Sequence, residues 1–347
     1  MSNYRKQDKG GNLFSAIEHQ QAIAKREIGI LKLREIIDWE SFRPLLEELC
    51  GYAKRDWTKG GSPPFDPVFM FKVLILQKYH GLSDDATEEQ IGDRLSFLNF
   101  LGLELGDDIP DAKTIWAFKE RIEEKNRNGS RRLFEAFSTI LEKKNLIARE
   151  GSIIDASFTE APRQHNTRSQ NQKIKEGERP EEFDINPCVG RQKDSDARWT
   201  KKNNQSYYGY KNHAKVDLIS KLIICSQTTS AQVHDSQVFK QLLDSKDQAV
   251  LADSAYHSAE NERYVLDRID ANEYLMRKAH RNKPLNEEEI KTNHTISRMR
   301  VRVEHVFGRM AQMGADLCRS IGLKRATSHN HLSNLTYNMD RYALLSR

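Results

Sequence analysis

The chain is poor in cysteine and contains no long apolar run. Its four cysteines, Cys50, Cys188, Cys225 and Cys318, lie far apart among 347 residues and form no Cys-x-x-Cys pair. This spacing argues against a zinc site or a disulfide framework and fits a reducing compartment. No apolar stretch approaches the ~20 residues that a membrane helix needs. The N-terminus, MSNYRKQDKGG, has no apolar signal region. We therefore expect a cytoplasmic protein.

A strong charge of one sign is also absent. The chain has 55 Lys and Arg against 50 Asp and Glu, a net charge of +5. Residues 1–150 carry 24 basic and 25 acidic side chains, and residues 151–347 carry 31 and 25. The basic second half mildly favours a polyanionic partner, although ordinary scatter explains the excess equally well. The length suggests two domains.

The first half shows the periodicity of successive helices. Helices are expected over 14–27 and 39–50, and Asp66-Pro67 is a typical helix start whose apolar run ends at Gly81. Thr87 and Gln90 resemble a capping box, and Asp111 is a candidate N-cap. Two short helices, 87–101 and 111–125, would form either a helix-turn-helix or part of a plain helical bundle.

The pattern changes at Gly151. Strands are expected in GSIIDASF, in a hairpin of YYGYKNHAKVDL and KLIICSQTTS, in AVLADSAY and in EYLMRK. Helices are expected over 235–243 and 258–267, and from 286 to 313 with a break near 292, whereas 163–206 reads as a polar connection. Three antiparallel strands followed by alternating helices and strands predict a mixed sheet, an order found in RNase H-like nucleases. Many other α/β folds share parts of this order. We expect a helical N-terminal DNA-binding domain over 1–148 and an RNase H-like catalytic domain over 149–347.

Three acids are placed where such a fold can bring them together. Asp155 lies inside the apolar run of the first strand, and Asp253 ends the run of a later buried strand. A carboxylate in a buried strand is costly unless it is paired or binds a metal, although either aspartate alone could be a cap or turn residue. Glu304 lies beside the apolar seam of the last predicted helix, about 100° around from Val303. Arg300, one turn earlier, could pair with Glu304 or hold a phosphate.

Three carboxylates suit the cleavage of a phosphodiester. Two Mg²⁺ ions about 3.5–4 Å apart can activate an oxygen nucleophile and stabilise the leaving oxygen. Mg²⁺ prefers oxygen ligands and keeps several waters, so a few carboxylates suffice.

At these residues the chain resembles the bacterial insertion-sequence transposases of family five, within the wider DDE group. The resemblance rests on the N-terminal stretch from PFDPVFMF to FKERI and on catalytic blocks in the family's order: GSIIDASF, DARWTKKNNQSYYGYKNHAKVD, VHDS, VLADSAY and RVRVEHVFGRM. It implies that Asp155, Asp253 and Glu304 are the catalytic residues and hold two Mg²⁺ or Mn²⁺ ions. Arg300 matches the family's arginine. Ser297 and Ala311 stand where the family has a tyrosine and a lysine, and Arg309 is a candidate substitute for the lysine.

The resemblance also implies the reaction and the partner. The expected protein is a nucleoid-associated transposase that acts on double-stranded DNA as a homodimer or higher oligomer. It would bind terminal inverted repeats, cleave strands and join the 3′-hydroxyl ends to target DNA. The alternatives are an RNase H-like nuclease without strand transfer and a catalytically inactive DNA-binding relic.

Cations and aromatic residues in the second half are candidate DNA contacts. The segment from Trp199 to Lys211 mixes both types, as surfaces that hold phosphates and stack bases do, although an edge strand with packing aromatics is the simpler alternative for any single tyrosine. The segment 163–180 would be either a DNA-contacting arm or a solvated linker. The predicted DNA contacts are Arg163, Arg168, Lys173, Trp199, Lys201, Lys202, Lys211, Arg300, Arg302 and Arg309.

Overall fold

The structure is a computed structural model of the 347-residue chain. It describes residues 15–25, 29–52, 58, 60, 63–124, 127–162, 166–202, 204–256, 258–268, 272–276 and 285–346. In the described part of the chain, no helix combines the length and the apolar character that crossing a membrane requires.

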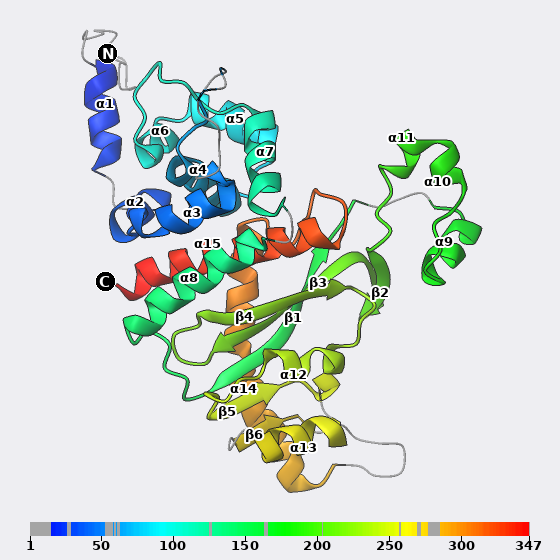
Figure 1. Cartoon of the computed structure of the whole chain (residues 1–347). Coiled ribbons are helices and arrows are strands. Elements are labelled where there is room, and N and C mark those ends of the chain that lie inside the picture. Colours follow the sequence, from blue (N-terminus) through cyan, green and yellow to red (C-terminus); the bar gives the residue numbers. More distant parts are fainter. Residues whose placement is uncertain are drawn as a thin grey trace, which may run out of the picture.

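The N-terminal half is helical, as its periodicity predicts (Figure 1). Asp66 caps the most buried helix by accepting the backbone N–H groups of Val68 and Phe69, at 2.8 and 3.0 Å. Gly81 follows the end of the same helix at a φ of 62°, as expected for a helix stop. The elements are α1 (Ser15–Ala24), α2 (Ile30–Ile36), η1 (Glu40–Phe42), α3 (Arg43–Cys50), α4 (Pro67–Tyr79), α5 (Asp84–Asp93), α6 (Leu95–Leu101), α7 (Ala112–Ile122) and α8 (Gly129–Lys143).

The expected helix over 87–101 is wrong in its start and its continuity. Ser83, not Thr87, is the N-cap, and it accepts the N–H of Ala86 at 3.1 Å. The Thr87 hydroxyl is buried inside α5 and donates to the Ser83 carbonyl at 2.6 Å. The chain then leaves the helical conformation at Arg94, which separates α5 from α6.

The second half forms one mixed sheet in the predicted RNase H-like order. The central strand β1 (Ser152–Glu160) pairs antiparallel with β3 (Gln205–Asp217), which pairs antiparallel with β4 (Ile223–Ser230). On its other side β1 pairs parallel with β5 (Ala249–Ala252), and β5 pairs parallel with β6 (Asn272–Leu275). The short β2 (Arg198–Lys202) extends the far end of β3. The order β4-β3-β1-β5-β6 therefore places the two parallel strands beside the central one.

Helices cover both faces of this sheet. Ile153, Val216 and Leu251 belong to the large core that also includes residues of the N-terminal helices and of the two last helices. Ile154 and Val250 face the opposite way, toward α12 (Phe239–Leu242) and α13 (Ala259–Arg268). This alternation follows from the two-residue period of a strand. The expected helix over 235–243 is shorter than predicted, because the chain makes the 3-10 turn η4 (Asp235–Gln237) before α12.

The segment 163–206 is more structured than its composition predicts. Thr167 opens a helix with a capping box that is completed by Gln170. The segment contains α9 (Arg168–Lys175), α10 (Glu182–Ile185) and α11 (Pro187–Gly190) before β2. These three helices stand away from the body of the molecule, beyond the end of the sheet that carries β2 (Figure 1).

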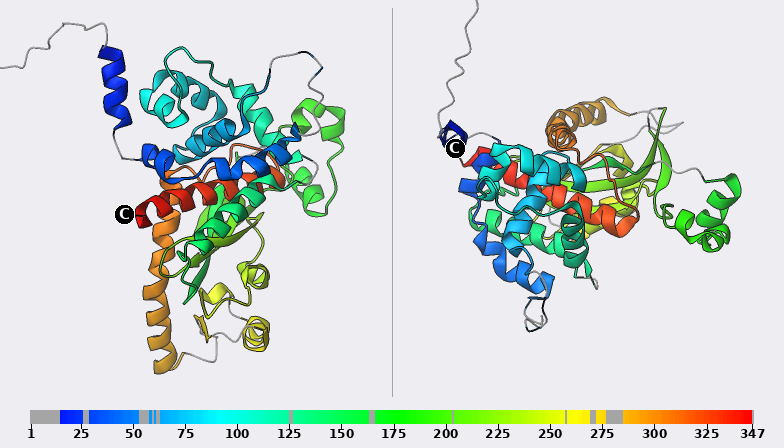
Figure 2. Two further views of the ribbon diagram at one scale, coloured as in Figure 1. Left: turned by 60° about the vertical axis from the view of Figure 1, so that its left-hand side comes forward. Right: turned by 90° about the horizontal axis from the view of Figure 1, so that it is seen from above.

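Two long helices end the chain. The expected break near 292 is absent, since α14 (Glu287–Gln312) is continuous and begins at the N-cap Asn286. It runs along the sheet and extends beyond it (Figure 2). The final helix α15 (Leu323–Leu345), for which no prediction was made, lies between the N-terminal helices and the sheet (Figures 1 and 2).

Helix α15 meets the sheet with polar side chains. Asn330 accepts from the Thr159 hydroxyl and donates to the Thr228 hydroxyl, both at 3.0 Å. One turn later, Asn334 accepts from the Asn212 amide at 2.9 Å and donates to the Ser226 hydroxyl at 2.8 Å. These amides are fully satisfied in the buried interface, as buried polar groups must be. They tie β1, β3 and β4 to a helix that also packs on α4 and α8.

Candidate active site

The two aspartates are brought together by the register of two neighbouring strands. In the parallel pair β1 and β5, Ile154 lies opposite Ala252. Asp155 and Asp253 follow these residues, so they occupy the next level of the pair, and adjacent strands lie about 4.8 Å apart. Each carboxylate is steadied by the following backbone N–H, that of Ala156 on Asp155 at 2.8 Å and that of Ser254 on Asp253 at 2.5 Å. The predicted convergence of the two aspartates is therefore present in the fold.

A single guanidinium joins the two carboxylates. Arg300, on α14, places Nη2 2.8 Å from Asp155 Oδ2 and Nη1 3.7 Å from Asp253 Oδ1. Nη1 also lies 3.4 Å from Met276 Sδ, and the buried Nε has no hydrogen-bond partner. The Arg300 side chain is 15% exposed and that of Asp155 19%, so this pair lies in a partly dehydrated setting. The two aspartates thus share one cationic partner.

Burial and charge act in opposite directions on Asp155. Burial raises the pKa of its carboxyl above the usual value, and the Arg300 guanidinium opposes this rise. A buried carboxylate depends on a cation to remain ionised, because desolvation disfavours the charged form. Asp253 is more accessible, with 39% of its side chain exposed. The carboxylate of Asp155 is therefore the more buried of the two, and that of Asp253 is the more exposed.

Glu304 lies one helical turn beyond Arg300, on an exposed part of α14. Across the described residues, no three acidic, histidine or cysteine side chains stand close enough to hold one metal ion together. The expected meeting of Glu304 with the two aspartates is therefore absent from this conformation. The expected Arg300–Glu304 pair is likewise replaced, since the guanidinium contacts Asp155 and Asp253 instead.

Sequence reasoning missed Tyr256, three residues after Asp253. Its side chain is fully buried, and its hydroxyl has no hydrogen-bond partner. Burial raises the pKa of this hydroxyl, and the negative charges of Asp235 and Asp155 raise it further. The only available signal was its place in the block VLADSAY, because nothing in the local pattern shows where a tyrosine hydroxyl will point.

Three predicted DNA contacts are engaged within the protein. Lys211 bonds the Asp235 carboxylate at 2.8 Å and the Val233 carbonyl at 2.9 Å, and its side chain is 12% exposed. Arg309 pairs with Asp340 at 2.9 Å. Arg302 is exposed but donates to the Leu218 carbonyl at 2.7 Å. Lys211 therefore holds Asp235 in place, and we leave it out of the proposed DNA surface.

Other predicted contacts lie on β2 and α9, near one end of the sheet. Trp199 is 48% exposed and packs at a tilt against Tyr208. Lys201 and Lys202 are exposed on the same strand. Arg168 is exposed at the start of α9, and Lys173 lies 3.9 Å from Glu181. Arg163 lies outside the described residues.

Two models of known protein families match the chain. Residues 147–339 match the family described as "Transposase DDE domain", and residues 18–121 match the one described as "Transposase domain (DUF772)". A solved structure of the piggyBac transposase synaptic complex with hairpin DNA is also similar. That likeness has 10% identity and a TM-score of 0.44, and it covers 96% of this chain and 76% of that one. The DDE-domain match spans more than half of the sequence and includes Asp155, Asp253 and Glu304. The chain belongs to the family of transposases with a DDE domain.

Proposed function

We propose that this transposase binds the terminal inverted repeats of an insertion sequence of family five, cleaves DNA strands and joins the 3′-hydroxyl ends to target DNA. The observation that carries the proposal is the convergence of Asp155 and Asp253 at one level of two parallel strands. Two carboxylates held this close are costly without a shared cation. The double-stranded DNA of the element and the target is the proposed substrate, and a homodimer or higher oligomer would bring two ends together.

The residues fit hard divalent cations. Asp155 and Asp253 present oxygen ligands, which Mg²⁺ and Mn²⁺ prefer, and both already share one positive group. Glu304 would complete the set only if it moved toward the two aspartates. When bound, two such ions supply an activated nucleophile and stabilise the leaving oxygen.

The protein's own side chains prepare this site. The Ala156 and Ser254 N–H groups orient the two carboxylates. Arg300 offsets part of the negative charge of the two aspartates, and with a divalent cation bound there its guanidinium would be available to hold a phosphate of the bound strand. The exposed Lys201, Lys202, Trp199 and Arg168 would hold DNA at the end of the sheet that carries β2.

The proposal is tested by a strand-transfer assay with the element's own ends, Mg²⁺ and a target plasmid. Asp155→Asn, Asp253→Asn and Glu304→Gln should each abolish cleavage and joining and leave binding of the ends intact. Glu288→Gln, an exposed acid in the first turn of α14, is the matched control and should stay active. Near-normal cleavage by any one of the three variants would remove that residue from the catalytic set.

The same assay separates the alternatives. Metal-dependent cleavage without joined products would indicate a nuclease without strand transfer. End binding without any cleavage by the unmutated protein would indicate an inactive relic, for which Ser297 and Ala311 would be the first residues to suspect.

A further inference from the structure

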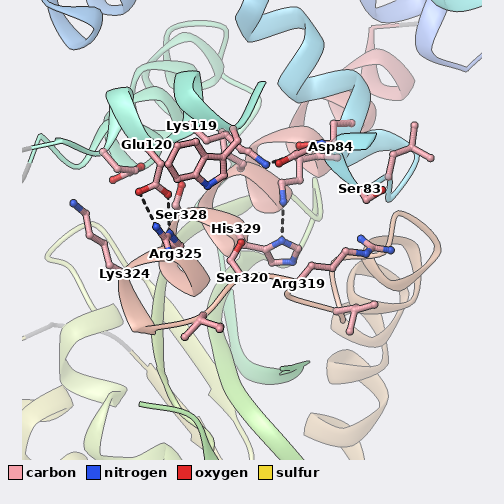
Figure 3. Close-up of a pocket in the computed structure, with 18 of the residues that line it drawn as sticks. Ser83, Asp84, Lys119, Glu120, Arg319, Ser320, Lys324, Arg325, Ser328 and His329 are labelled. Carbon is pink, nitrogen blue, oxygen red and sulfur yellow. Dashed lines mark hydrogen bonds and ion pairs between the residues drawn. The ribbon is translucent and has the colours of Figure 1, made fainter. Parts of the chain in front are cut away.

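A cavity of about 660 Å³ separates the N-terminal helices from the start of α15 (Figure 3). Its walls come from α4, α5 and α7 on one side and from the α14–α15 connection and α15 on the other. Gly81, just after α4, and Gly314, just after α14, bring the two segments together beside the cavity. Both have positive φ, and a Cβ on Gly314 would stand 2.9 Å from Gly81 Cα. The backbones approach so closely here that the cavity has a defined shape.

A lysine without a carboxylate partner lines this cavity. Lys78 Nζ lies 2.7 Å from His329 Nδ1, the contact that Figure 3 marks at His329. His329 Nε2 lies 3.1 Å from the Ala315 carbonyl, which can only accept. The Nε2 atom therefore carries the proton, and Nδ1 accepts a hydrogen bond from Lys78. Within the described residues Lys78 has a neutral partner and no ion pair.

Burial makes this arrangement costly for the lysine. Burial, together with the positive charge of Lys119, lowers the pKa of Lys78 to about 7. A buried ammonium that lacks a counter-ion is a strained arrangement, which an anionic ligand would relieve.

The remaining charges of the cavity leave a positive excess. Lys119 pairs with Asp84 at 2.5 Å, and Arg325 pairs with Glu120 at 2.7 Å. Arg319 and Lys324 are exposed at the cavity, and the described residues offer them no ion pair. Of the two further acids, Glu123 accepts the Ser130 N–H at 2.8 Å, and Asp85 stays exposed at the rim. The lining side chains thus include five cations and four acids, a net charge of +1 when Lys78 is protonated, and within the described residues Lys78, Arg319 and Lys324 have no ion pair.

These donors match a phosphate better than a single carboxylate. A phosphate offers several oxygens at once, which the Lys78 ammonium and the Arg319 guanidinium, from two different segments, can share. Lys324 lies on the opposite side of the cavity from Arg319 (Figure 3). The cavity also exceeds the volume of a phosphate, which leaves space for an organic group. Trp116 lines it with 51% of its surface exposed, so its ring is available to a sugar or base.

We propose that this cavity binds the phosphate group of a nucleotide, within a DNA strand or free, through Lys78 and Arg319. The site stands apart from Asp155 and Asp253 and requires no metal. Its binding can therefore be measured in the presence of EDTA, and the result does not depend on whether strand transfer occurs.

The first experiment measures the melting temperature of the full-length protein with inorganic phosphate at constant ionic strength. The pH is kept below 7, where Lys78 is charged. Phosphate should raise the melting temperature of the unmutated protein and of Lys113→Met, an exposed lysine of α7 outside the cavity. The rise should disappear in Lys78→Met. Arg319→Gln should weaken it, and this exposed residue serves if Lys78→Met does not fold.

A second arm identifies the source of the phosphate. Fluorescence anisotropy with a short DNA duplex in EDTA compares Lys78→Met with Lys113→Met. An affinity lower by about fivefold or more in Lys78→Met indicates a phosphate of DNA. Unchanged DNA affinity together with a lost phosphate response indicates a free nucleotide or phosphate. A phosphate response that is absent from the unmutated protein, or equal in all variants, would overturn the proposal.

Discussion

Asn338 of α15 uses both ends of its amide on one residue of the sheet, Ile223 of β4. The Ile223 N–H donates to Asn338 Oδ1 at 2.9 Å, and Asn338 Nδ2 donates to the Ile223 carbonyl at 2.8 Å. The pairing of β3 with β4 shifts its register between Lys215 and Val216, next to this contact. The Asn338 amide therefore makes the two hydrogen bonds that a neighbouring strand would make, at a point where the pairing of β3 with β4 is irregular. In this way α15 supplies hydrogen-bond partners to the sheet.

Replacing Asn338 with leucine should destabilise the protein. Both bonds are buried, and leucine would leave the Ile223 N–H and carbonyl without their side-chain partner. Unsatisfied buried groups cost about 1–3 kcal/mol each, so we expect a loss of about 2–6 kcal/mol in the free energy of unfolding. Urea denaturation measures it. Leu344→Ala, 44% exposed on the same helix, is the control and should change stability little. Equal stability of the two variants would show that the amide contact is not a stabilising one.

Two buried tyrosines should respond oppositely to loss of their hydroxyls. Tyr210 donates to the Asp194 carboxylate, with its oxygen 2.7 and 2.8 Å from the two acceptor atoms, so Tyr210→Phe should cost about 1–3 kcal/mol. The Tyr256 hydroxyl has no partner, so Tyr256→Phe should leave the melting temperature unchanged or raise it. The comparison is made by thermal unfolding without metal. A large loss in Tyr256→Phe would show that its hydroxyl has a partner in solution.

The stability of the protein should depend on pH through Lys78. The pKa of this lysine is about 7 in the folded chain and about 10.4 when unfolded. Between these values the unfolded chain binds a proton that the folded chain does not, so the free energy of unfolding rises with pH. The slope from this one group is at most about 1.4 kcal/mol per pH unit. Below pH 7 both states are protonated, and the cost of the buried charge is constant.

The Lys78→Met variant lacks the part of the pH dependence that comes from Lys78. Comparing it with the unmutated protein therefore separates this lysine from the other groups that titrate. The variant should be more stable than the unmutated protein near pH 7, and the difference should shrink as the pH approaches 9. The pKa of His329 is lowered well below 6.5, so this histidine stays neutral throughout. Denaturation in a buffer without phosphate gives the two curves. Parallel curves across this range would contradict the low pKa of Lys78.

Arg300 and a divalent cation should compete for the same carboxylates. Arg300→Gln removes the charge that bridges Asp155 and Asp253, so Mn²⁺ should bind more tightly, by about tenfold for the loss of one nearby charge. Calorimetric titration with Mn²⁺ measures the affinity, and Asp155→Asn should lose the binding. Strand transfer should fall in Arg300→Gln despite tighter metal binding, because the phosphate loses a donor. Weaker Mn²⁺ binding in this variant would show that Arg300 supports the metal site.

Local patterns predicted the framework of the protein well. The apolar run Ile153-Ile154 around Asp155 and the run ending at Asp253 each indicated a buried strand. The predicted mixed sheet contains both strands, and the approach of Asp155 to Asp253 was expected from that architecture. The N-cap at Asp66 depends only on adjacent residues and was confirmed as well.

Such local patterns could not predict contacts between segments that lie far apart in the sequence. Neither the choice of Arg300 for the two aspartates nor the exposed place of Glu304 follows from the period of α14, since both depend on how that helix lies against the sheet. The polar composition of 163–206 hid short helices, because their caps and ion pairs leave little trace in hydropathy.

Sequence by itself determined where the strands lie along the chain and placed Asp155 inside one buried strand and Asp253 just after another, because apolar periodicity is a local property. Only the tertiary structure decided that α15 joins the two halves of the chain. Its buried face carries asparagines, whose amides are tolerated there only because partners far away in the sequence, such as Asn212 for Asn334, satisfy them. A polar side chain can be buried in the core only when a hydrogen-bond partner lies next to it. Here the partner comes from a distant part of the sequence, so its position depends on the fold.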